Sequence, residues 1–470
     1  MPFVEDDRSL RANAYTRSLN YTYDRSLQRG RGAFHYVFNE GGLSCSRAAT
    51  AGNRMCLVSR REQSQIRRQR PNFVYVDHGC WVDNADGNGT RRRDFALICG
   101  PHAYVCSYAP GGGVPRSRIP SVQQFFRELS ARGGGVRVYG YATARPPMSS
   151  STPTDPNLYL FLADLHLPPV SWFYRQHQLV GLSSLGVRNP PSWLSNLPAM
   201  RRQPHHLMRN YYSLAQRDRE RSHLPTARGP VSGNPDIFLH AGRDLVRFLG
   251  ELRGLSAETK RRLHFIQTGD MFELWLGRDY QFAAGRSRPR WLDSGSVNRV
   301  SDWALEVIIQ NTPVIDAFRR LERAGLAEVK YLWGNHDAYL KDPTVTTQLG
   351  LAQRDPTYTG LNNDLFSEHG HRFDRSNHDN TSAWSGPAGA NAAFYIPVFR
   401  TAEPLARTLT SIGHPSTMRD CYLLGATLIY LHTRYDRGSS PFSIYVMGHS
   451  HDRKLFSFNI GIRYHLYAQP

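Results

Sequence analysis

The amino-acid sequence predicts an α/β fold, and three observations support this class. The chain has 470 residues, of which 40% are hydrophobic and 11% aromatic, as in an ordinary folded protein. Several short apolar segments have the length of buried strands and run into Asp, Asn or His residues. Between them, residues 237–253 and 301–324 have the apolar spacing of amphipathic helices. Strands that alternate with helices are typical of the α/β class.

A segment rich in Pro, Ser and Thr predicts a division of the chain into two domains. Residues 144–156 read ARPPMSSSTPTDP, which is typical of a linker. We expect a small α/β or α+β domain without an assigned role at 33–143, preceded by a loose, Arg-rich terminus at 1–32. The main domain is expected at 157–470, with an Arg- and Pro-rich insertion at about 168–236.

Residues 33–143 predict three strands and one helix. The segment DNADGNG at 83–89 is rich in turn residues and predicts a hairpin between a strand at 73–76 and a strand at 95–99. Residues 121–132 begin at a serine and are followed by a glycine, as expected for a helix. A further strand is predicted at 136–141.

In residues 157–470, four predicted strands end at residues that commonly bind metals. The strands lie at 158–163, 263–267, 329–332 and 444–447. Five motifs lie behind them or between the last two: ADLHL, GDMFE, GNHD, EHGHRFD and GHSH. They supply seven candidate metal ligands: Asp164, His166, Asp270, Asn335, His369, His449 and His451.

The spacing of these residues allows two ions. In extended backbone, side chains two positions apart face the same side, so Asp164 and His166 can reach one ion, and the HxH pair of GHSH repeats that geometry. Asp270 follows a glycine in a turn, where its two oxygens can bridge two ions. The mixed oxygen and nitrogen ligands suit two divalent ions, with Mn preferred and Fe, Zn, Ni or Mg as alternatives.

Two ions about 3.5–4 Å apart form a site for phosphoryl displacement. His336 is adjacent to Asn335 and cannot easily point at the same ion, so we expect it to protonate the leaving oxygen or stabilise the transition state. We expect Asp337 to accept a hydrogen bond from His336 and fix its tautomer. A single DxH or HxH pair is common in turns, so it is the full ordered set that predicts a catalytic site.

These motifs, in this order, resemble those of the calcineurin-like metallophosphoesterases. The resemblance covers about 157–470 and implies a four-layer αββα sandwich, two mixed β-sheets flanked by helices, with metals on loops at the sheet ends. It implies that Asp164, His166, Asp270 and His451 serve one ion. It further implies that Asp270, Asn335, His369 and His449 serve the other, with His336 as the catalytic histidine.

A narrower resemblance concerns the branch that contains UDP-2,3-diacylglucosamine hydrolase, which cleaves a pyrophosphate. GDMFELW, the WLGRD that overlaps it and EHGHRFD carry this likeness, and Glu273 and Trp275 match that branch. We expect structural roles for both, Trp275 in packing and Glu273 next to the ligands. The chain differs from the branch in having His336 where its typical hydrolase has Arg, and in its long insertion.

The positive charge of the chain is concentrated in two regions. The formal net charge is +19, and the first 150 residues and residues 170–235 carry nearly all of it, almost entirely as arginine. Arginine binds phosphate and carboxylate groups through two parallel hydrogen bonds, so this excess fits an anionic partner. The alternative is a codon bias without functional meaning.

The function predicted from these residues is hydrolysis of a phosphoester or pyrophosphate bond, with a phosphorylated, nucleotide- or lipid-linked substrate. One alternative is a phosphodiesterase or nuclease acting on nucleic acid or nucleotides, or an exported toxin-like effector with the same chemistry. Another is an inactive binding module on the same fold. We expect a cytoplasmic protein with no signal peptide or membrane span, which a lipid substrate would bring into peripheral contact with a membrane.

Overall fold

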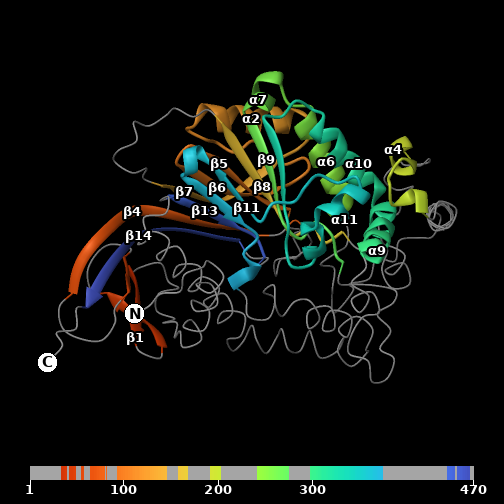
Figure 1. The fold of residues 1–470 in the computed structure, drawn as a ribbon. Helices are drawn as coiled ribbons and strands as arrows, with labels where there is room; N and C mark the ends of the chain where they lie inside the picture. Colours follow the sequence, from red (N-terminus) through yellow and green to blue (C-terminus); the bar gives the residue numbers. More distant parts are fainter. Residues whose placement is uncertain are drawn as a thin grey trace, which may run out of the picture.

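The computed structural model describes about half of the chain. The described residues are 33–39, 42–48, 54–57, 64–79, 81, 93–144, 157–167, 191–202, 241–274, 297–373, 442–449 and 453–465. They form a mixed α/β structure with two large mixed sheets and helices (Figure 1). The α/β class predicted from the sequence is therefore confirmed. The predicted loose terminus at 1–32 and most of the insertion lie outside the described residues.

The first large sheet has six strands in the order β10-β9-β8-β5-β6-β7. Their bounds are Glu328–Leu332, Leu263–Thr268, Leu158–Leu162, Asp94–Cys99, His102–Tyr108 and Val136–Thr143. Strands β8, β9 and β10 are parallel, whereas β5, β6 and β7 continue the sheet in antiparallel order. All four strands predicted in 157–470 form close to their expected bounds.

The second large sheet has the order β11-β12-β13-β4-β14-β3. Its strands are Thr357–Gly360, Leu365–Glu368, Ile444–Met447, Ser64–His78, Arg453–His465 and Arg54–Leu57. Strands β12, β13 and β4 are parallel, and β14 returns antiparallel to β4. A separate two-stranded hairpin consists of β1 (Ala33–Asn39) and β2 (Gly42–Ala48).

Strand β8 shows why its sequence, LYLFL, has no polar position. Leu158, Leu160 and Leu162 face a core shared with the helices, while Tyr159 and Phe161 face a second core between the two large sheets. A strand buried on both faces requires a continuous apolar run.

Helices cover the outer face of the first large sheet, as Figure 1 shows. The α-helices are α2 (Pro120–Ala131), α4 (Ser192–Ser195), α6 (Ala241–Arg253), α7 (Ala257–Arg262), α9 (Val297–Gln310), α10 (Thr312–Glu322) and α11 (Pro343–Gln348). Short 3₁₀ turns lie at Met200–Arg202, Ala338–Lys341, Leu361–Asn363 and His371–Phe373. In the part of the chain described, no helix has the length and apolar character needed to cross a membrane.

The single helix predicted at 301–324 is two helices, α9 and α10. Pro313 lies in the first turn of α10. Proline has no backbone N–H, and its ring clashes with the carbonyl four residues earlier, so it suits a helix start and not a helix interior. The prediction recognised the apolar spacing but not this break.

The predicted hairpin across residues 83–89 is wrong. Strand β4, which contains 73–76, belongs to the second large sheet, and β5 belongs to the first. The hairpin partner of β5 is β6, joined through a turn in which Gly100 has a φ of 53°. Turn residues at 83–89 predicted a change of direction but could not specify which strands pair.

The predicted separate N-terminal domain is not what the sheets show. Strand β5 pairs directly with β8, across the linker expected at 144–156. Strand β4 is an inner strand of the second large sheet, hydrogen-bonded to β13 and β14. Residues 64–144 therefore contribute strands to both large sheets. The expected linker itself lies outside the described residues apart from Ala144.

Candidate metal centre

The candidate ligands follow the carboxyl ends of parallel strands. Asp164 follows β8, Asp270 follows β9 and Asn335 follows β10, so the three come from neighbouring strands of the first sheet. His369 and His449 follow β12 and β13, which are neighbours in the second sheet. The two sheet edges meet, because side chains from both are in contact at this point.

The backbone of the ligand loops is not extended, although the prediction that Asp164 and His166 face the same side rested on extended backbone. Asp164, His166, Asp270 and His449 have positive φ angles of 54°, 42°, 52° and 69°. Strand β8 ends at Leu162, before the first of them. Non-glycine residues in this region are uncommon and strained, and such strain concentrates at functional sites. The prediction that Asp164 and His166 lie together holds, but a tight turn brings them together.

Hydrogen bonds from the backbone hold the loops against each other. The amides of Leu165 and His166 both donate to the carbonyl of Asp270, at 2.9 Å each. The His336 amide donates to Asp270 Oδ1 at 2.8 Å, and the His449 amide donates to Asp164 Oδ2 at 3.0 Å. The loops that carry Asp164, Asp270, His336 and His449 are thus held together by hydrogen bonds that require no bound ion.

Two groups of side chains could each hold an ion, and Asp270 belongs to both. The first group is His166, Asp270 and His336, and the second is Asp270, His369 and His449. Within each group the ligand atoms lie within 4.8 Å of one another. This arrangement agrees with the predicted bridging position of Asp270.

The distances around Asp270 give the shape of the site. Asp270 Oδ2 lies 3.1 Å from His369 Nε2 and 3.9 Å from His166 Nε2. Asp164 Oδ1 lies 3.8 Å from His166 Nε2 and 4.0 Å from His369 Nε2. Asn335 Oδ1 lies 3.1 Å from His369 Nε2, which brings the predicted amide ligand to the same point. His451 lies outside the described residues.

The described residues fit a pair of divalent ions. Carboxylate, amide and imidazole groups converge with their oxygen and nitrogen atoms on a common space, and these types bind borderline divalent metals. Asp164, Asp270 and His369 are at most 1% exposed, whereas the His336 side chain is 18% exposed. The centre is therefore buried on the protein side and opens to solvent beside His336.

Glu273 orients two imidazoles at once. Its carboxylate accepts from His166 Nδ1 through Oε2 at 3.0 Å and from His336 Nδ1 through Oε1 at 2.9 Å. Each imidazole thereby keeps its proton on Nδ1 and presents Nε2 toward Asp270. Glu273 is fully buried, so its position is set by packing as well as by these bonds.

The role expected for Asp337 is wrong. Asp337 does not accept a hydrogen bond from His336. It accepts from the backbone amides of Met271 at 2.8 Å and Gly334 at 2.7 Å, and so joins the GDMFE and GNHD loops. GNHD places Asp337 next to His336 in the sequence, but the turn after β10 directs the two side chains apart.

The charges of the site are strongly coupled. Burial acts to raise the pKa of Asp270, but the charges of His369, His336 and His166 outweigh it and hold that pKa well below its usual range. Burial also acts to raise the pKa of Glu273, yet His336 and the two imidazole hydrogen bonds lower it to about 2. For His369, burial favours the neutral ring, but Asp270 and Asp164 raise its pKa to about 10.

Two further histidines lie at the site without having been assigned to it. The ring centroid of buried His371 lies 5.4 Å from that of His369 and 6.2 Å from that of His449. It forms an HxH pair with His369, a spacing that could have identified it. His78, at the end of β4, is fully buried behind Asp164 and His369. No motif around His78 could have identified it, because strand pairing alone brings it there.

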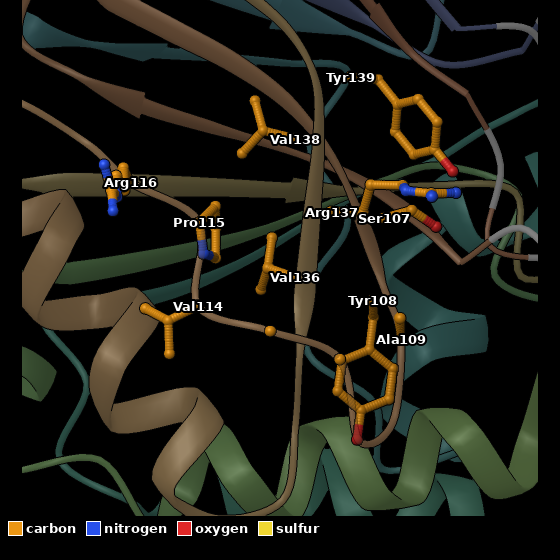
Figure 2. Close-up of a pocket in the computed structure, with 12 residues that line it drawn as sticks. Ser107, Tyr108, Ala109, Val114, Pro115, Arg116, Val136, Arg137, Val138 and Tyr139 are labelled. Carbon is orange, nitrogen blue, oxygen red and sulfur yellow. The ribbon is translucent and has the colours of Figure 1, made fainter.

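A separate pocket of about 640 Å³ lies at the end of β6 and the start of β7 (Figure 2). Its lining includes Val114, Pro115, Val136 and Val138, with Arg116 and Arg137 pointing to different sides. None of the predicted site residues lines it. Of the Arg-rich insertion, only 191–202 is described, and Arg201 there is exposed.

Comparisons with protein-family models, with curated proteins and with solved structures found no match.

Proposed function

We propose that the chain is a hydrolase that uses two divalent metal ions to cleave a phosphoester or pyrophosphate bond. The observation that carries this proposal is the pair of side-chain groups that share Asp270, the first of which has His336 on its solvent side. The proposal includes the four-layer sandwich, with further helices on the outer face of the second sheet. Mn is the ion we favour, because the ligands mix oxygen and nitrogen.

Asp164, His166 and Asp270 would hold one ion, and Asp270, Asn335, His369 and His449 the other. Such ions supply a Lewis acid and a hydroxide nucleophile near neutral pH. The buried carboxylates of Asp164 and Asp270 provide the negative charge that retains two cations. The His336 side chain is 18% exposed, so an anionic substrate would approach the reacting position from that side.

His336 would exchange a proton with the leaving oxygen. Glu273 fixes its Nδ1 as the hydrogen-bond donor, which leaves Nε2 for the substrate. Nε2 lies 4.0 Å from Asp270 Oδ2, and the His336 side chain is 18% exposed, so this nitrogen lies on the solvent side of the first ligand group. This is the position that an acid near the attacked phosphorus requires.

The test is Mn-dependent product release from a panel of substrates: a simple phosphomonoester, a simple phosphodiester, a UDP-linked lipid, and single- and double-stranded DNA. We expect one class to be cleaved. Asp270→Asn should lose Mn binding and activity together, whereas His336→Ala should bind Mn and lose about 10²-fold or more in kcat.

The panel also distinguishes the alternatives. Cleavage of DNA with a steep loss of binding at higher salt would support the nuclease, which the net charge of +19 favours. A purified chain that binds no Mn and cleaves nothing would contradict the hydrolase and leave a binding module.

A further inference from the structure

Strand β4 brings a histidine from outside the motif-bearing segment 157–470 to the metal centre. Its residue Asp77 pairs in register with Met447 of β13, so His78 lies beside Gly448, the residue before His449. His78 is fully buried. In the described part of the chain, its Nδ1 has no hydrogen bond of good geometry, and only the backbone of the adjacent Gly79 acts as a weak partner of the ring. Buried polar side chains with poorly satisfied hydrogen bonds are uncommon in folded proteins, so the position of His78 needs an explanation.

The other nitrogen of His78 reaches the loop that orients a ligand. His78 Nε2 lies 3.4 Å from the hydroxyl oxygen of Thr268. The carbonyl of the same Thr268 accepts a 2.8 Å hydrogen bond from His369 Nδ1, which leaves His369 Nε2 to face Asp270. Thr268 therefore stands between His78 and His369.

The imidazole of His78 also packs against Gly448. A Cβ atom at Gly448 would lie 3.6 Å from His78 Cε1 and only 2.7 Å from Asp164 Oδ2. Ala163, Asp164 and the His78 ring thus all crowd the place where a side chain at position 448 would begin. The His449 amide donates to the same Asp164 oxygen, so His78 packs against the backbone that this hydrogen bond holds.

We propose that His78 is a positioning residue of the candidate metal centre, which holds Thr268 and, through it, the orientation of His369, and which supports the Gly448 backbone before His449. This inference rests on the proposed function, since it assumes that His369 and His449 bind an ion. It assigns a role at the site to a residue of the first third of the chain.

The test compares three variants of the full chain by titration with Mn²⁺, following free Mn²⁺ by electron paramagnetic resonance. His78→Phe keeps a ring of similar volume but no nitrogen. His78→Gln offers a polar group near the place of Nε2. Thr268→Val replaces the hydroxyl, which also lies 3.5 Å from the Leu162 carbonyl, by a methyl group. The unfolding midpoint of each metal-free variant is measured in parallel.

We expect His78→Phe and Thr268→Val each to weaken binding of at least one Mn²⁺ about tenfold or more, the range for residues that orient metal ligands. The double variant should lose no more than either single one, and His78→Gln should recover most of the affinity. The metal-free unfolding midpoints should stay close to that of the unchanged chain.

Wild-type Mn²⁺ affinity in His78→Phe would overturn the inference and leave His78 as a packing residue. If His78→Phe does not fold, wild-type affinity in Thr268→Val would overturn it equally. Absence of Mn²⁺ binding by the unchanged chain is a different result, because it contradicts the proposed function itself.

Discussion

At the scale of single residues, Glu273 connects a candidate metal ligand to the candidate acid. One buried carboxylate accepts from a candidate ligand, His166, and from the candidate acid, His336. The GDMFE motif predicted a position near the ligands for Glu273, and Asp337 was expected to fix the tautomer of His336. In the structure, Glu273 and not Asp337 accepts the hydrogen bond from His336. Asp337 instead accepts from backbone amides of two different loops.

We therefore predict that Glu273→Gln impairs both functions. An amide has one acceptor oxygen, so its NH₂ group replaces either Oε2, which faces His166 Nδ1, or Oε1, which faces His336 Nδ1. Metal affinity should fall in the molecules that lose the bond to His166 and kcat in those that lose the bond to His336, so the population should show both losses, each up to about 10–100-fold. Mn²⁺ titration and steady-state kinetics measure the two effects separately.

The matched control is Glu251→Gln, because Glu251 is also a buried carboxylate with two partners but lies on α6, paired with Tyr108 and Arg247. It should retain wild-type metal affinity. Equal losses of metal affinity in both variants would mean that any buried Glu→Gln change disturbs the fold. This result would contradict the role proposed for Glu273.

Metal binding should release protons. Asp270 and Asp164 raise the pKa of His369 to about 10, so this ring is protonated at neutral pH in the metal-free chain, whereas a ligand must be neutral. The apparent Mn²⁺ affinity should therefore rise with pH up to about 10, by about tenfold per unit for one proton. Calorimetry in buffers of different ionisation enthalpy measures the proton count. An affinity that does not change between pH 7 and 9 would exclude His369 as a ligand that loses a proton.

At the scale of elements, the sequence predicted those strands and helices whose bounds depend on one local pattern. The strands that end before Asp164, Asp270, Asn335 and His449 were predictable, since an apolar run that stops at a polar cluster marks a buried strand end. The left-handed backbone of these residues was not, because Asp and His adopt it only when the surrounding structure enforces it. The break between α9 and α10 lies at Pro313, and the apolar spacing on which the single helix at 301–324 was predicted does not take a proline into account.

At the scale of the whole molecule, pairing between distant strands was the part that local patterns could not provide. A strand signal identifies an element but not its neighbour, so the run before His78 gave no sign that it lies between β13 and β14. The linker composition of 144–156 favoured two domains, yet side-chain bonds also cross it. Arg93 pairs with Asp244 of α6 at 2.8 Å, and Glu128 of α2 accepts from Ser256 at the start of α7.

This architecture predicts that residues 151–470 do not fold alone. Removal of 1–150 takes β4 out of the interior of the second sheet and uncovers β8. The core also loses fully buried side chains such as Phe95 and Leu97, each contributing about 1.5–3 kcal/mol by burial. We expect the truncated chain to be insoluble or to lack cooperative unfolding, as measured by circular dichroism during heating.

Co-expression of 1–150 with 151–470 is the control, because the cut falls in the Pro- and Ser-rich segment outside the strands. The two pieces should assemble and bind Mn²⁺ like the intact chain, since the strand pairs that join them need no covalent connection. A soluble 151–470 that unfolds cooperatively and binds two Mn²⁺ would instead restore the separate N-terminal domain and remove the structural basis for a role of His78. These two experiments decide whether residues 1–150 form a detachable domain or part of the candidate metal centre.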